Sequence, residues 1–230
     1  MIIGINGYAG TGKDTIGKLI QFATLDSIPE KVTIDTILND DYSIHQWWLE
    51  EKSGWEIKKF AGKLKFIAEI LTGIPVEKFE DQEFKKSQLG PEWGMTVRDF
   101  LQKLGTDGLR DGLHSNTWVN ALMADYVPIA DEAYVMEDGS IFDMKEMPGY
   151  PVYPDWVITD VRFPNEAQAI KNAGGIVIRV DRPGYKPVNP HPSETALDNW
   201  DFDHKIMNGS DTVSLLFTVG SILRKENLLK

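Results

Sequence analysis

The segment that most constrains the fold is a glycine-rich turn near the start of the chain. Residues 7–13 read G-Y-A-G-T-G-K and match the pattern G-x-x-x-x-G-K. They follow an apolar, β-branched run at 1–6 and precede a stretch at 13–25 with apolar residues at helical spacing. In a strand, glycine-rich turn and helix of this kind, backbone N–H groups point at phosphate oxygens. The sequence therefore predicts a loop that binds the phosphates of ATP or GTP, formed by Gly10, Gly12 and Lys13.

The next position departs from the usual form of this loop. Asp14 stands where a serine or threonine usually binds Mg²⁺, and Thr15 follows it. Asp14 is placed to reach Mg²⁺ through water or to act on the side of the nucleophile, and Thr15 to contact the α-phosphate or to cap the helix locally. An alternative stays open for Asp14, since a carboxylate in the first turn of a helix also favours the helix dipole.

Short apolar strands alternate with amphipathic helices along the rest of the chain. This alternation predicts an α/β fold with a parallel sheet covered on both faces. We expect the further strands at 55–60, 155–159, 175–180 and 204–207. We expect the further helices at 61–71, within 96–127 (a second one at 117–126), at 165–172 and at 210–227.

Two segments interrupt this alternation. Residues 26–54 read irregularly, and residues 131–154 contain a β-hairpin pattern around Asp138-Gly139. We interpret both as insertions in a single domain that spans residues 1–230.

The composition excludes several classes of function. The chain has 24 Lys and Arg against 35 Asp and Glu, a net charge of −11, which disfavours binding to a nucleic-acid polymer. It has no cysteine, so disulfides, thiolate metal sites and a cysteine nucleophile are excluded. No export signal and no membrane span are visible, because the most apolar stretch, 213–223, is broken by Thr218 and Gly220. We therefore expect a cytoplasmic protein that does not bind membranes.

Lysines after the second strand suggest a pocket for a phosphate acceptor. Lys59, Lys63 and Lys65 cluster there, and we expect Lys63 to point at the cleft while Lys58 and Lys65 lie in solvent. A solvated helix face is the alternative for each of them.

A second polar set follows in the helical region. Arg98 and Gln102 are four residues apart and share a helix face. With Thr106 they offer hydrogen bonds to a base, and Trp118 offers a stacking surface. For Trp118 a place in the core is the favoured alternative, whereas for Arg110 we favour contact with phosphate.

The densest signal is D-V-R-F-P-N-E at 160–166, directly after a predicted strand. Ligands of open α/β sheets bind at the carboxyl ends of the strands, where Asp160 and Arg162 fall. Arg162 suits a phosphate, and Asp160 suits Mg²⁺ through water or the hydroxyl of an acceptor. Helix capping accounts for Asn165 and Glu166 equally well.

The loop after the next strand carries two further candidates. Arg182 is placed to clamp phosphates or pack on adenine as a lid arginine. His191 is interpreted as a hydrogen-bonding loop residue, because no two histidines have the spacing of metal ligands.

In combination these motifs resemble the bacteriophage-type deoxynucleoside monophosphate kinases. The resemblance rests on G-Y-A-G-T-G-K-D-T at 7–15, K-L-K at 63–65, L-G-T at 104–106 with Arg110 and Trp118, D-V-R-F-P-N-E at 160–166 and H-P-S-E at 191–194. It implies a three-layer P-loop kinase fold with a five-stranded parallel sheet in the order 2-3-1-4-5. It also implies Mg²⁺-ATP as donor, a deoxynucleoside monophosphate (dNMP) as acceptor, a host-cytoplasmic location if the chain is phage-encoded, and allows a homodimer.

The resemblance also implies roles for particular residues. Lys13, Asp14 and Thr15 would hold the donor phosphates and the metal, with Arg182 as the donor's lid. Catalysis would fall to Lys13, Asp14, Asp160 and Arg162. The acceptor site would consist of Lys63, Arg98, Arg110, Trp118, Asp160, Arg162 and Glu166.

Two rival functions remain open. One is a P-loop kinase for another small metabolite, such as dephospho-coenzyme A or a nucleoside, and the other is a nucleotide-binding protein without turnover.

Overall fold

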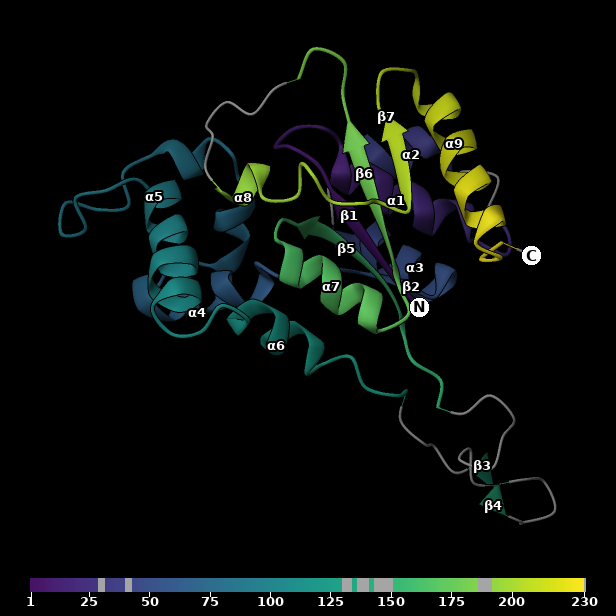
Figure 1. Cartoon of the computed structure of the whole chain (residues 1–230), viewed down its shortest axis with the longest axis horizontal. Helices are drawn as coiled ribbons and strands as arrows, with labels where there is room; N and C mark the ends of the chain where they lie inside the picture. Colours follow the sequence, from purple (N-terminus) through teal and green to yellow (C-terminus); the bar gives the residue numbers. More distant parts are fainter. Residues whose placement is uncertain are drawn as a thin grey trace.

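The central sheet has the topology that the sequence predicts. The structure is a computed structural model that describes residues 1–28, 32–39, 43–129, 134–135, 141–142, 151–185 and 192–229. Five parallel strands lie in the order β2-β5-β1-β6-β7, which is 2-3-1-4-5 along the chain, so the predicted sheet is confirmed (Figure 1). The strands are β1 (Ile2–Asn6), β2 (Trp55–Lys58), β5 (Asp155–Val161), β6 (Ile176–Asp181) and β7 (His204–Met207).

Helices cover both faces of this sheet, because successive strand residues point to opposite sides. Ile3 and Ile5 of β1 pack with α1 (Lys13–Ala23) and α9 (Thr212–Lys225) on one face. Ile2 of the same strand packs with α6 (Thr117–Met123) and α7 (Pro164–Asn172) on the other. Figure 1 shows α7 in front of the sheet and α1 behind it. The result is a three-layer α/β/α domain.

The segment at 26–54 is more regular than expected. It contains two helices, α2 (Ile34–Asn39) and α3 (Ser43–Ser53). They pack on α1 through a small apolar cluster of Phe22, Ile37 and Leu49. The expectation of an irregular segment is therefore wrong for these residues. It failed because contacts with α1, more than a strong period of their own, stabilise the two helices.

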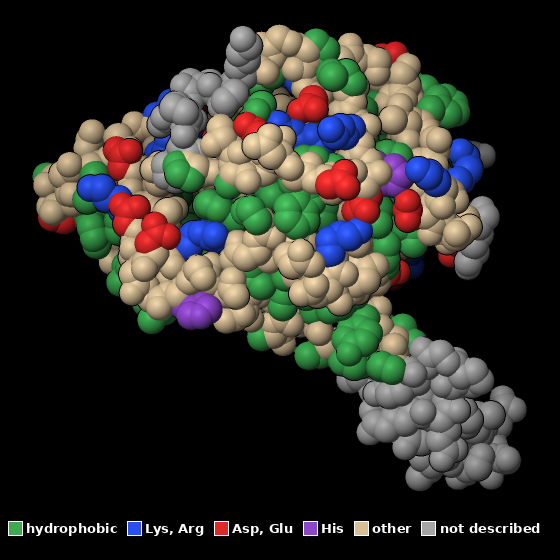
Figure 2. All heavy atoms as spheres, in the orientation of Figure 1, with side chains coloured by type: hydrophobic (Ala, Val, Ile, Leu, Met, Phe, Trp, Pro, Cys, Tyr) green, Lys and Arg blue, Asp and Glu red, His purple; other side chains and the backbone are tan. Residues whose placement is uncertain are grey.

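The described part of 131–154 forms the predicted hairpin. β3 (Tyr134–Val135) pairs antiparallel with β4 (Ile141–Phe142), and both lie away from the main sheet (Figure 1). The chain leaves and re-enters the body at neighbouring points, since Ile129 N–H donates to Val152 O at 2.8 Å. Hydrophobic side chains gather at this root (Figure 2), among them the exposed Val127, Ile129, Val152 and Tyr153.

A helical lobe with its own small core lies beside the sheet. Its elements are α4 (Gly62–Thr72), the 3₁₀ turns η1 (Val76–Glu80) and η2 (Phe84–Lys86), α5 (Val97–Gln102) and the π-helix η3 (Lys103–Asp111). The core of the lobe is formed by Ala68, Phe79, Val97 and Phe100. A last short helix, α8 (Pro192–Thr195), precedes β7. None of the helices in the described part of the chain is long and apolar enough to cross a bilayer.

Two local features position the site. β5 continues two residues beyond the predicted end, so Asp160 lies within the strand and not after it. α1 lies close to β5 at Gly17, where an added Cβ would come within 2.8 Å of Thr159 Cγ2. The first turn of α1 and the end of β5 are therefore held next to each other.

Candidate active site

The phosphate loop joins β1 to α1 in the way that the motif predicts. Gly10 and Gly12 have φ angles of 80° and 93°, a conformation that favours glycine. α1 begins at Lys13, with Thr15 half-buried in its first turn. The Lys13 ammonium donates to Gly7 O and Tyr8 O, both at 2.8 Å, so the side chain folds back onto the start of the phosphate loop.

Lys13 has an unusual proton affinity. Burial, and after it the positive charge of Arg162, lower the pKa of Lys13 to about 8. Lys13 and Arg162 therefore lie close together beside the loop. An anion bound between them would stabilise the charged form of both side chains.

Asp14 is the centre of a contact that the sequence does not reveal. Thr159 Oγ1 donates to Asp14 Oδ1 at 2.6 Å, and Lys59 Nζ lies 3.2 Å from the same oxygen. Desolvation by the surrounding protein would raise the pKa of Asp14, but Lys59 and the Thr159 hydroxyl lower it below the usual value. The side chain is still 58% exposed, so the carboxylate is ionised and accessible.

Lys59 faces the site in place of the lysine singled out from the sequence. Burial opposes its charge, yet the carboxylates of Asp14 and Glu80 raise its pKa above the usual value. Lys63 instead forms an ion pair with Asp125, 2.8 Å away. Lys59, directly after the carboxyl end of β2, therefore lies at the site. Lys63, in the first turn of α4, pairs with Asp125 and does not contact Asp14.

Asp160 makes two backbone contacts with the segment that follows β2. Its Oδ1 accepts from Phe60 N–H at 2.8 Å, and its Oδ2 accepts from Ala61 N–H at 2.9 Å. Both oxygens thus fix residues 60–61, directly after Lys59, to the end of β5. The carboxylate has a structural role here that the sequence did not predict.

Arg162 is tied to the phosphate loop by a carboxylate from another segment. Glu194 of α8 accepts from Arg162 Nη1 through Oε1 at 2.7 Å and from Ala9 N–H through Oε2 at 2.9 Å. The Arg162 side chain is 38% exposed. The D-V-R-F-P-N-E segment, the phosphate loop and part of the H-P-S-E segment therefore meet at one point.

Glu166 and Arg110 form a buried pair behind Arg162. Glu166 Oε2 accepts from the backbone N–H groups of Arg162 and Phe163, at 2.7 and 3.0 Å, which confirms the capping interpretation for this residue. Burial raises the pKa of Glu166 to about 7. The Arg110 guanidinium lies 3.6 Å from the Phe163 ring centroid and donates to Asn165 Oδ1 at 2.9 Å. Its Nη1 is buried, donates to no described atom and lies 3.9 Å from Glu166 Oε1.

A small cavity of about 250 Å³ lies on the other side of the phosphate loop. Arg182 Nη1 donates to Gly10 O at 3.4 Å, and Asn208 Nδ2 donates to Thr11 O at 2.8 Å. Both contacts place the cavity against the loop. It is lined by Arg182, Pro183, Asn208, Gly209 and Ser210.

A cluster of cations surrounds Glu80 at the edge of the helical lobe. Lys65 is buried and paired with Glu80, so the expectation that Lys65 lies in solvent is wrong. Lys58, expected beside it, is half-buried next to Glu56. Burial, followed by the like charges of Lys65, Arg98 and Lys59, lowers the pKa of Lys85. Arg98 is exposed and reaches Gln82 Oε1 at 3.4 Å.

Trp118 has a place in the core, the alternative favoured from the sequence. It is 7% exposed, and its Nε1 donates to Gly105 O of the π-helix at 2.9 Å. It therefore holds the helix that carries Arg110. His191 lies outside the described residues.

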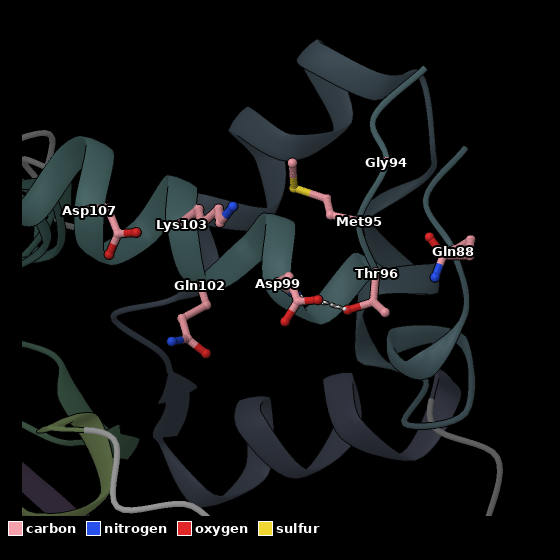
Figure 3. A pocket seen from close by; sticks show the side chains of 8 residues that line it. All are labelled: Gln88, Gly94, Met95, Thr96, Asp99, Gln102, Lys103 and Asp107. Atoms are coloured by element: carbon pink, nitrogen blue, oxygen red, sulfur yellow. Dashed lines mark hydrogen bonds between the residues drawn. The ribbon is translucent and has the colours of Figure 1, made fainter. Parts of the chain in front are cut away.

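A cavity of about 390 Å³ lies apart from this site, against α5 and the π-helix (Figure 3). Within it Asp99 accepts a hydrogen bond from Thr96, the residue that caps α5. Gln102, expected from the sequence to offer a hydrogen bond to a base, lines this cavity and not the site around the phosphate loop. The lining residues are Gln88, Gly94, Met95, Thr96, Asp99, Gln102, Lys103 and Asp107.

Sequence reasoning missed four residues that the structure brings to the site. Lys59 belongs to the lysine cluster noted in the sequence, but Lys63 was the lysine expected to face the cleft. Lys85 lies in a run of charged residues that is typical of a solvent-exposed surface. Thr159 had a signal, since it stands at the predicted carboxyl end of a strand. Glu194 had one too, in the H-P-S-E motif, but its contact with Ala9 spans 185 residues.

The sequence of this chain is similar to those of known kinases. A model of the deoxynucleotide monophosphate kinase family matches residues 57–218. A putative deoxynucleotide monophosphate kinase of Acanthamoeba polyphaga mimivirus is 34% identical over 158 residues, covering 65% of this chain and 72% of that protein. The deoxynucleoside-5'-monophosphate kinase of Escherichia phage T5 is 24% identical over 259 aligned positions, covering 94% and 92%. The deoxynucleotide monophosphate kinase of Enterobacteria phage T4 is 28% identical over 129 residues, covering 56% and 46%.

Proposed function

Because this chain belongs to the deoxynucleotide monophosphate kinase family, we propose that the residues gathered around its phosphate loop transfer the γ-phosphoryl group of ATP to a dNMP. The protein is a phosphotransferase with small-molecule substrates and ATP as the donor. The products are ADP and a deoxynucleoside diphosphate.

The donor half of the site lies between α1 and the loops after β6 and β7. The N–H groups of the phosphate loop, including those of Gly10 and Gly12, bind the phosphates together with the Lys13 ammonium. The cavity beside Arg182 and Asn208 adjoins that loop, and we assign the adenosine moiety to it. Arg182, at the mouth of this cavity, acts as the lid arginine.

Mg²⁺ fits the oxygen donors at the start of α1. Mg²⁺ is typically held by one or two carboxylates, by water and by the phosphates of the substrate, so a large protein cage is not required. Thr159 and Lys59 both contact Oδ1 of Asp14, and we assign the metal to Oδ2, with Thr15 beside it. When bound, the ion neutralises charge on the donor phosphates.

The acceptor half lies on the side of β2, β5 and the π-helix. Lys59 and Arg162 are the cations next to the phosphate loop, and we assign the acceptor phosphate to Lys59, with Arg162 shared between it and the terminal phosphate of the donor. Arg110, with a buried Nη1 that donates to no described atom, and Glu166 border the acceptor behind Arg162. The cations around Glu80, Lys85 and Arg98 among them, extend this positive edge outwards.

The observation that carries the proposal is the contact of 3.2 Å between Lys59 and Asp14. It joins the donor side to the acceptor side through one ion pair at the carboxyl ends of β1, β2 and β5. Phosphoryl transfer needs little covalent help from a protein beyond alignment and neutralised charge. Lys13, Lys59 and Arg162 supply that charge around the transferred group, while Asp160 holds the backbone beside Lys59 in place.

The test is ADP release measured with each of the four dNMPs, with AMP and with dephospho-coenzyme A as acceptors. We expect turnover with at least one dNMP and less than about a hundredth of it with dephospho-coenzyme A, since a site that pairs polar groups rejects a mismatched ligand strongly. Nucleotide binding without acceptor-dependent ADP release would rule out the proposal.

A variant pair checks that the measured activity belongs to this site. Lys13→Ala removes the loop cation and should lower kcat by at least about a hundredfold while the fold is kept. Lys171→Ala removes a cation from the far end of α7, where Lys171 pairs with Asp203, and should leave kcat within about twofold. Equal rates in wild type and Lys13→Ala would show that another site is responsible.

A homodimer, the absence of a nucleic-acid partner and a host-cytoplasmic location stay predictions from the sequence. Sedimentation of the purified chain tests the first of them.

A further inference from the structure

Glu194 makes contacts of the kind that a phosphoryl group makes. One oxygen accepts from the Arg162 guanidinium and the other from a backbone N–H of the phosphate loop. Guanidinium groups and loop N–H groups are the donors that proteins use for phosphate. The side chain is only 16% exposed, so this carboxylate is held against the loop and is not a freely moving surface group.

The surrounding charges explain why a carboxylate is stable there. Burial and Arg162 both disfavour the charged form of Lys13, and Glu194 opposes them. The negative charge of Glu194 therefore balances two neighbouring cations. A phosphate bound between them would supply the same charge and make Glu194 redundant.

The segment around Glu194 is anchored on one side. Leu197, three residues further on, is 1% exposed in the core, and Asp198 accepts from the Tyr8 hydroxyl at 2.9 Å. A change at Glu194 can therefore stay local to α8 while the following turn keeps its place.

We propose that Glu194 is a positioning residue that takes the place of the donor's terminal phosphate on Arg162 and Ala9, and that this phosphate displaces it. The inference rests on the donor site proposed above. ATP competes with Glu194 for the two donors and repels its carboxylate. ADP lacks the terminal phosphate and leaves the contact intact. Glu194 thus weakens ATP binding relative to ADP, and it holds Arg162 in place once the phosphoryl group has left.

The test compares two ligands in the variant Glu194→Gln. Calorimetric titration with the Mg²⁺ complexes of ADP and of an ATP analogue with an imido β–γ bridge gives both dissociation constants. We expect the analogue to bind about tenfold more tightly to Glu194→Gln than to wild type, because one charge-assisted hydrogen bond no longer competes. Affinity for ADP should change by less than about twofold.

Asp201→Asn is the matched control, because it removes an exposed carboxylate from the same segment. Both of its dissociation constants should stay within about twofold of wild type. Unchanged or weaker binding of the analogue to Glu194→Gln, or equal tightening for both ligands, would overturn the inference. If wild type binds neither ligand, the donor site itself is wrong and the inference falls with it.

A second measurement does not depend on that variant. The chain has no cysteine, so Ala196→Cys places a single label on an exposed position next to α8. Fluorescence of the label should respond to the ATP analogue and not to ADP. The same response to both ligands, or to neither, contradicts displacement by the terminal phosphate.

Discussion

Lys13 links the shape of the phosphate loop to its charge. The ammonium donates to two carbonyl oxygens of its own loop, and burial, followed by the nearby charge of Arg162, lowers its pKa to about 8. The cation that we assign to the donor phosphates therefore titrates near the pH at which most enzymes work.

This titration predicts a pH profile. In the free protein Lys13 loses its proton as the pH rises through about 8, so kcat/KM for ATP should fall above that pH. Bound phosphates favour the ammonium, so kcat itself should fall only at higher pH. Steady-state kinetics between pH 6 and about 10 measure both. Lys13→Arg stays protonated throughout, so a fall above pH 8 that persists in it belongs to another group.

The same titration bears on stability. The folded pKa of Lys13 lies below the ordinary lysine value of 10.5, so between about 8 and 10.5 the unfolded chain binds more protons than the folded one. The contribution of Lys13 to the free energy of unfolding therefore rises with pH across this window.

The lysines after β2 provide a second prediction. Lys59 contacts Asp14, whereas Lys63 pairs with Asp125. Lys59→Ala should raise the KM for the dNMP and lower kcat, together about a hundredfold in kcat/KM, because it removes a cation next to the transferred group. Lys63→Ala should change kcat/KM by less than about threefold, because its ion pair is exposed. The reverse order would restore the assignment of Lys63 made from the sequence.

Individual pairings were the least predictable part of the site. The motifs single out Lys13, Arg162 and Glu166, which the structure brings close to one another, but motifs do not say which carboxylate meets which cation. Asp14 and Lys59 are 45 residues apart, and their contact depends on β2 and β5 lying side by side. Which carboxylate pairs with which cation is therefore determined by the tertiary structure, here by the pairing of β2 with β5.

At the scale of elements, short apolar runs predict the central strands β1, β5 and β6 well, because these are buried on both faces. The edge strands β2 and β7 are buried only in part. The order of the sheet came from the family resemblance and not from those runs. The π-helix at Lys103–Asp111 was not predictable from the sequence, because the wider turns of a π-helix give no recognisable spacing of apolar residues in so short a segment. The π-helix positions Arg110 so that its guanidinium donates to Asn165. Trp118 stabilises the π-helix by donating a hydrogen bond to Gly105 O.

The approach of α1 to β5 yields a prediction about Gly17. A methyl group there would come within 2.8 Å of Thr159 Cγ2 and push α1 away from the strand. Gly17→Ala should lower the free energy of unfolding by about 1–2 kcal/mol, despite the better helix propensity of alanine. It should also weaken ATP binding, because Thr159 holds Asp14. Urea denaturation and calorimetry measure the two effects.

Gly62 is the matched control for this substitution. It begins α4, and an added Cβ meets no atom within 4 Å. Gly62→Ala should be neutral or slightly stabilising. Equal losses in the two variants would mean that the packing of α1 on β5 is not the cause.

At the scale of the whole molecule, the net charge of −11 does not indicate the local charge around the phosphate loop. Lys13, Lys59, Arg162 and Arg182 lie at the same edge of the sheet, while exposed carboxylates are spread over other surfaces. An acidic chain can thus present a positive site to small anions, because potentials near a cleft depend on local charge.

The hairpin insertion provides a prediction at this scale. Ile129 and Val152 are joined by a backbone hydrogen bond, so a short turn can connect the two sides. Replacement of residues 131–150 by Asn-Gly should leave kcat/KM within about twofold and shift Tm by no more than about 5 °C. Kinetics and thermal unfolding test this. Loss of turnover in a folded variant would assign the insertion a part in the reaction.

The two backbone contacts of Asp160 have a consequence for how the rate depends on temperature. They fix the residues after Lys59 to the strand that precedes Arg162, so the two cations keep their separation before any substrate arrives. A site assembled in advance loses little freedom on the way to the transition state. We therefore expect the contribution of Asp160 to the proposed reaction to lie in the entropy of activation, so that loosening these two contacts slows the reaction with little change in its activation enthalpy.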